Sequence, residues 1–211
     1  MQKEVIRSWP LFIGIGIMMI AHGLQMQLMG IRSVVEDFSV ITTGIFMAGF
    51  YIGYFSGSQT TPKLVQKVGH IRVFAAFASL ASLSALLAAV YVNPVMWTLS
   101  RIVTGISLVS CYIVAESWLN DRATNKNRGQ LLSAYMIILY IGLGIGMLLL
   151  NVSNPKNYEP FILVSVLLSL ALVPILLTKR SAPKFKKIGT ISVKELYKIS
   201  PLGTVSSFCT G

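Results

Sequence analysis

Six stretches of about twenty mostly apolar residues decide what this chain can fold into. They cover residues 10–29, 41–60, 73–92, 95–118, 131–151 and 160–178. An α-helix needs about 20 such residues to cross ~30 Å of hydrocarbon at ~1.5 Å per residue. Strands of a membrane barrel are shorter and alternate apolar with polar residues. The pattern therefore predicts an all-α fold, a polytopic membrane bundle of six transmembrane helices.

The composition also favours lipid over water as the surroundings of the folded chain. Only 12% of the 211 residues are charged, whereas soluble domains carry about 25%. The formal net charge of +11 would suggest nucleic acid in a soluble protein, but in a membrane protein the position of the cations decides. We predict the lipid bilayer as a partner and no nucleic acid.

The Lys and Arg residues gather on one side of the predicted bundle. Arg32 and Lys156 alone fall on the other side, and Arg101 falls inside the fourth segment. The remaining cations are Lys3, Arg7, Lys63, Lys67, Arg72, Arg122, Lys126, Arg128 and the group Lys179, Arg180, Lys184, Lys186, Lys187, Lys194 and Lys198. Cytoplasmic loops are enriched in such residues. We therefore expect both ends of the six-helix unit to lie in the cytoplasm.

The sequence divides into three predicted parts. Residues 1–178 form the six-helix bundle, residues 179–199 form a basic cytoplasmic linker, and residues 200–211 resemble the truncated start of a seventh helix. Too few residues follow position 200 to cross a bilayer. We expect a fragment of a protein about twice as long; the alternative is a complete six-helix protein. The basic linker could also bind anionic lipid head groups, at about 1 kcal/mol per cation.

Polar residues inside the spans mark the first and fourth helices as candidates for lining a cavity. Polar side chains in a membrane span normally face protein or a water-filled space. The candidate cavity residues are His22, Gln25, Arg101, Tyr112 and Glu116. The third and sixth segments are almost wholly aliphatic apart from scattered serines, and we expect them to be peripheral.

Helical rise predicts that His22, Gln25 and Arg101 lie at one depth. His22 and Gln25 lie roughly 18–23 Å from the start of the first helix, and Arg101 lies about 21 Å from the same side. Glu116 lies ~22 Å further along the helix of Arg101, so it cannot pair with Arg101 directly. Arg101 either lines a polar cavity that serves substrate binding or proton coupling, or ties its helix to neighbours as a structural residue. His22 has the same two interpretations, with a packed histidine favoured.

Glycines recur at helical spacing in the second and fifth segments. Small residues four positions apart let helix backbones approach closely. The predicted packing glycines are Gly49, Gly53, Gly57, Gly105, Gly142 and Gly146. Static packing and a surface that slides against a second half are both compatible with this pattern.

Two short motifs and the helix order resemble the major facilitator superfamily. Residues 62–72 fall where that family has its G-x-x-x-D-R-x-G-R-[RK] signature, and Arg101-Ile-Val-Thr-Gly105 is similar to its R-x-x-x-G signature. Lys67, Gly69 and Arg72 fit the first motif, whereas Gln66 replaces the acidic residue. The resemblance implies a gating loop, to which we assign Gln66, Lys67, Gly69, Arg72, Asp121 and Arg128.

The same resemblance implies a function and a location. It implies a secondary carrier that moves a small solute by alternating access about a midplane site, with a C-terminal six-helix half as partner. The run around Glu116 looks like a bacterial branch of uncertain substrate, which implies a bacterial inner membrane. The drug antiporter signature G-P-x-x-G-G is not matched by residues 142–146, so a drug antiporter is not inferred.

Other functional classes fit the sequence less well. A membrane enzyme would need a nucleophile motif, but Leu108 replaces the second glycine after Gly105-Ile-Ser107. A channel or a sensor is the alternative to a carrier, although channels usually show a ring of charges or a repeated pore element. We predict no metal and no cofactor, and Cys111 and Cys209 are interpreted as small buried hydrophobic residues.

Overall fold

The protein is an all-helical bundle in the computed structural model, which describes residues 8–177, 197–203 and 205. Six helices are long and apolar enough to cross a membrane, and the described residues form no strand. They are α2 (Trp9–Val35), α3 (Val40–Val68), α4 (His70–Val90), α5 (Pro94–Arg122), α6 (Arg128–Leu149) and a sixth span made of α7 (Glu159–Leu170) and α8 (Leu172–Leu176). A short 3-10 helix, η1 (Leu150–Val152), follows α6. The predicted fold class and number of spans are confirmed.

The predicted tail lies largely outside the described residues. Most of the linker at 179–199 is not described, and of residues 200–211 only 200–203 and 205 are described. The three-part division of the chain therefore stays a prediction.

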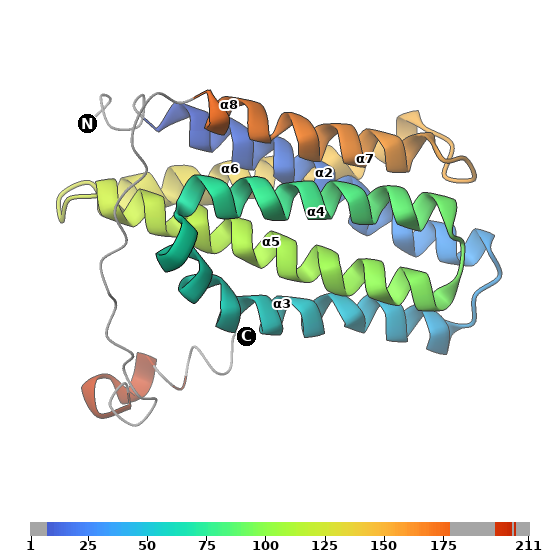
Figure 1. The fold of residues 1–211 in the computed structure, drawn as a ribbon, viewed down its shortest axis with the longest axis horizontal. Coiled ribbons are helices and arrows are strands. Elements are labelled where there is room, and N and C mark those ends of the chain that lie inside the picture. The colour runs from blue at the N-terminus through green and yellow to red at the C-terminus, as the bar shows by residue number, and fades with distance from the viewer. Residues whose placement is uncertain (1–7, 178–196, 204, 206–211) are drawn as a thin grey trace.

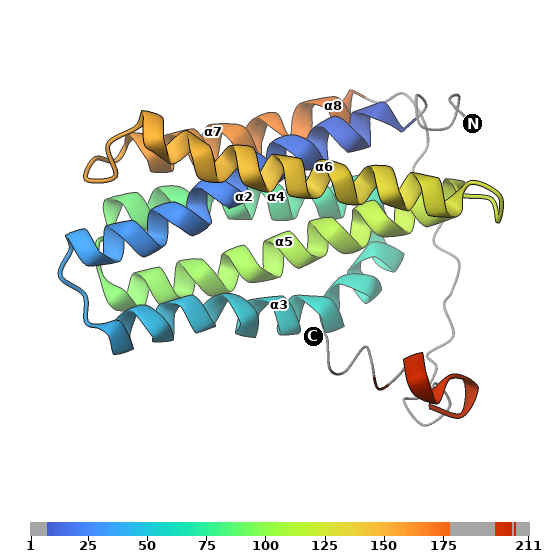
Figure 2. The same ribbon diagram turned by 180° about the vertical axis from the view of Figure 1, so that it is seen from behind.

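The spans run up and down the bundle in alternation. Connections α2–α3, α4–α5 and α6–α7 meet at one end, and α3–α4 and α5–α6 meet at the other, where α2 begins (Figures 1 and 2). Two side chains in the turns cap the helices that follow. The Ser39 hydroxyl accepts the Thr42 N–H at 3.1 Å, and the Asn93 side chain accepts the Val95 N–H at 2.8 Å. Both are N-caps that satisfy an orphan amide at a helix start.

Glycine faces hold two pairs of helices in backbone contact. A Cβ on Gly53 of α3 would overlap the Ile102 carbonyl oxygen of α5. A Cβ on Gly146 of α6 would likewise overlap the Ile20 carbonyl oxygen of α2. The pairs α3–α5 and α2–α6 are the most extensive contacts in the bundle. The predicted glycines thus face helices of this same chain rather than a second half.

Serine hydrogen bonds join α4 to α7. The Ser82 hydroxyl lies 2.7 Å from the Ser165 hydroxyl and also donates to the Ser165 carbonyl at 3.1 Å. Such bonds across helices stabilise membrane bundles by about 0.6 kcal/mol each. The outward faces of both helices are aliphatic, as predicted, with Leu83 and Val166 among their exposed residues.

The least buried spans, however, are α3 and α6. Only 22% of their most apolar windows is buried, against 44% for α4 and 39% for the sixth span. Hydropathy predicts that the third and sixth spans are peripheral. It does not predict that α3 and α6, which are the second and fifth spans, are more exposed than either.

The prediction of a basic loop at residues 62–72 is wrong, because nearly all of these residues are helical. Helix α3 continues to Val68 and α4 begins at His70, so Gly69, with φ of +88°, is the whole connection. Pro62 lies inside α3, which bends near its C-terminal end (Figure 1). Proline removes one backbone hydrogen bond and kinks a helix without ending it. Helix α3 can therefore extend past the apolar segment that predicted its length.

Candidate functional site

A buried arginine on α5 and a histidine on α2 meet at one phenylalanine of α3. The Arg101 Cζ lies 4.7 Å from the centroid of the Phe50 ring. The His22 ring lies 5.6 Å from the same centroid, nearly parallel at 17°. His22 and Arg101 therefore share a level, as helical rise predicts. Phe50 was not predicted from the sequence, because an apolar aromatic residue in a span cannot be distinguished from its apolar neighbours.

Polar atoms of this cluster, and of Gln25 one helical turn after His22 on α2, are buried without hydrogen-bond partners among the described residues. They are His22 Nδ1, Gln25 Nε2, and Nε and Nη1 of Arg101. Arg101 is only 4% exposed. Leaving a buried donor unsatisfied costs about 1–3 kcal/mol, and more for a charged group. A cation–π contact offsets part of that cost, about 2 kcal/mol when desolvated. The cluster consequently has free capacity to bind an anionic or hydrogen-bonding group.

A cavity of about 230 Å³ lies beside this cluster, between α2, α3, α5 and α6. Tyr112 and Glu116 of α5 line it, together with Tyr54, Tyr135 and Tyr140. The Tyr112 hydroxyl donates to the Met19 sulfur at 3.0 Å, and the Tyr135 hydroxyl lies 3.5 Å from Glu116 Oε1. These contacts fix two rings in the cavity wall. The sequence indicated Tyr112 and Glu116 but not the three other tyrosines.

The structure divides the predicted cavity residues into two groups. His22 and Arg101 meet at Phe50, whereas Tyr112 and Glu116 line the cavity. Tyr54 connects the groups, because its ring lies 6.0 Å from that of Phe50 one helical turn away. Gln25 is buried on α2. Helices α2 and α5 are not among the extensively packed pairs, so the space between them is bordered by α3 and α6.

The predicted gating residues gather at the end where α2 begins, but mostly on helices. Gln66 and Lys67 lie in the last turn of α3, Arg72 in the first turn of α4, Asp121 in the last turn of α5 and Arg128 at the start of α6; only Gly69 is a loop residue. His70, which departs from the family motif, is buried and hydrogen-bonded to the Ser117 hydroxyl at 3.0 Å. This bond ties the α3–α4 corner to α5.

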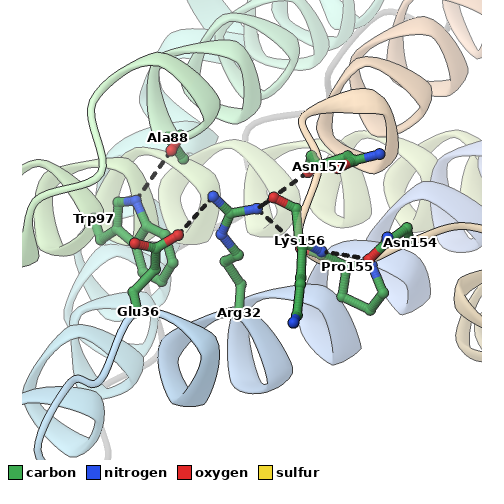
Figure 3. Close-up of polar contacts among 8 residues, drawn as sticks. All are labelled: Arg32, Glu36, Ala88, Trp97, Asn154, Pro155, Lys156 and Asn157. Carbon is green, nitrogen blue, oxygen red and sulfur yellow. Dashed lines mark hydrogen bonds and ion pairs between the residues drawn. The ribbon is translucent and has the colours of Figure 1, made fainter.

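At the opposite end, Arg32 clamps the connection between η1 and α7 (Figure 3). Its guanidinium donates to the carbonyls of Pro155 at 3.0 Å, of Asn157 at 3.3 Å and of Lys156. It also pairs with Glu36 at 2.6 Å. The sequence predicts Arg32 in a loop between spans, but Arg32 lies on α2 and stabilises the connection before α7.

The fold and these interior polar groups define a class, the polytopic helical membrane proteins with a polar site between helices. The model of the Major Facilitator Superfamily matches residues 11–209, and the chain belongs to this superfamily of membrane transporters, which are generally not enzymes.

Among its relatives is the "Uncharacterized MFS-type transporter YcaD" of Escherichia fergusonii, 25% identical over 156 residues, which are 74% of this chain and 41% of that protein. The protein of the same description from Escherichia coli O6:K15:H31 is 25% identical over 166 residues, 78% of this chain and 43% of that protein. The chain thus spans about two fifths of the length of the curated relatives it matches.

Proposed function

We propose that the protein is a secondary carrier that moves a small solute across a bacterial inner membrane by alternating access. The observation that carries this proposal is Arg101, buried against Phe50 with two nitrogens unpartnered among the described residues. A charged side chain within a membrane span is costly, and such residues mark substrate or ion pathways by default. The solute site would lie between α2 and α5.

The cation distribution supports an orientation for this carrier. Six described cations, Lys63, Lys67, Arg72, Arg122, Lys126 and Arg128, lie at the end where α2 begins. The far end has Lys156 and the clamped Arg32. We propose that the first end is cytoplasmic. In a carrier as long as the relatives, the second half would pack against the exposed faces of α3 and α6.

Substitution of Arg101 tests the proposal. Cells would express the protein from its complete reading frame, and solute gradients between cells and medium would be measured without preselecting a substrate. We expect at least one gradient in wild-type cells that Arg101→Ala abolishes and Arg101→Lys reduces. Equal gradients in all three strains would remove Arg101 from transport and leave it a structural residue.

A further inference from the structure

The cavity between α2, α3, α5 and α6 has a lining rich in aromatic side chains. Tyrosine side chains come from α3, α5 and α6: Tyr54, Tyr112, Tyr135 and Tyr140. The face of an aromatic ring carries negative electrostatic potential and attracts cations, and several rings around one space form an aromatic cage for alkylated ammonium ions. Tyr140 is 71% exposed and Tyr54 38% exposed, so these two stand at the mouth.

Glu116 is the one charged side chain in the lining. The Tyr135 hydroxyl donates to its Oε1 at a long 3.5 Å. No Lys or Arg within the described ranges lies within ion-pair distance of it, and Arg101 is ~22 Å away along α5. Because Coulomb energies grow as the surroundings become less polar, this carboxylate favours a cation in the cavity and disfavours an anion.

The remaining lining distinguishes an organic cation from a metal ion. Met19, Met136 and two leucines of α6 provide apolar walls. Calcium and magnesium need several oxygen ligands, and no three His, Cys, Asp or Glu side chains of the described chain gather to hold a metal. The cavity has a volume of about 230 Å³. That volume suits a compact alkylated ammonium ion.

We propose that this cavity binds a compact alkylated ammonium ion, with the four tyrosines facing its alkyl groups and Glu116 neutralising its charge. This assignment rests on the proposed carrier function, for which it names the substrate class.

Calorimetric titration with choline tests the assignment, using the protein from its complete reading frame in lipid nanodiscs. The neutral isostere 3,3-dimethylbutan-1-ol is the comparison ligand. We expect Glu116→Gln to weaken choline binding at least about thirtyfold. Tyr54→Leu should weaken it about five- to thirtyfold, whereas Tyr54→Phe, which keeps the ring, should retain most of the affinity.

Glu159→Gln and Tyr91→Leu are the matched controls, because both side chains are exposed outside the cavity. They should bind choline like the wild type. Absence of choline binding, equal binding of the isostere, or unchanged binding by Glu116→Gln would overturn the assignment. A solute gradient that depends on Arg101 but belongs to an anion would overturn it while sparing the carrier function. Choline binding as expected without any gradient that depends on Arg101 would support the cation site and remove Arg101 from transport.

Discussion

Replacing Gly53 by alanine tests how closely α3 must approach α5. A Cβ at position 53 would overlap the Ile102 carbonyl oxygen and lie 2.8 Å from its carbonyl carbon and 3.0 Å from its Cα. All three are backbone atoms, so no side-chain rotation can relieve the contact. The helices must separate, and separation opens gaps along an interior that is packed to crystal-like density.

The expected cost follows from two opposing effects. Overpacking a close interface destabilises by about 1–3 kcal/mol, while Gly→Ala inside a helix stabilises by up to ~1 kcal/mol. We expect a net loss of about 1–2 kcal/mol, which is about a five- to thirtyfold change in the folding equilibrium.

Unfolding in mixed micelles with increasing dodecyl sulfate, followed by circular dichroism, measures this loss. Gly44→Ala is the control on the same helix, because a Cβ there meets nothing within 4 Å. Gly53→Ala should unfold at a lower detergent fraction than the wild type, and Gly44→Ala at an equal or higher one. Identical midpoints for the two variants would refute the claim that backbone contact sets the α3–α5 spacing.

Two further substitutions test the ends of the bundle. Arg32→Gln should speed amide hydrogen exchange at residues 154 and 156–158 at least about tenfold, because charged hydrogen bonds contribute about 1.5–3 kcal/mol and the clamp on three carbonyls is lost. Arg128→Gln at the other end is the control, and equal exchange in both variants would contradict the clamp. Pro62→Ala should straighten α3 by removing a kink of roughly 20° or more, lengthening the distance between spin labels at positions 44 and 66; an unchanged distance would mean that packing, not Pro62, bends α3.

The helices of this protein could be predicted because hydrocarbon thickness dictates them. About twenty apolar residues are needed per span, so counting finds six. The ends were less predictable, since apolarity stops at the hydrocarbon edge while helical hydrogen bonding continues. Val35 and Val68 close helices that extend beyond the apolar segments. For the same reason, a predicted loop proved to be two helix ends joined at Gly69.

The candidate site was predictable only in part. Helical rise places His22 and Arg101 at one level, because depth depends on residue number alone. Their shared contact with Phe50 does not follow from depth, since Phe50 comes from another helix and its side chain is apolar. Glycine spacing marks the packing face of α3 but not its partner. The cavity depends on which helices lie next to one another. That Tyr54 and Tyr135 line it can be recognised only when the positions of α3 and α6 are known.

Helix α3 links bundle packing to the site through consecutive residues. Gly53 packs on the α5 backbone, and the next residue, Tyr54, lines the cavity. From α5, a Cβ on Gly105 would overlap the Phe50 carbonyl oxygen and lie 2.8 Å from the Tyr54 nitrogen. The backbone positions that carry Phe50 and Tyr54 are therefore set by glycine contacts rather than by adjustable side chains. Any motion that opens or closes the cavity along this border must therefore move α3 and α5 together.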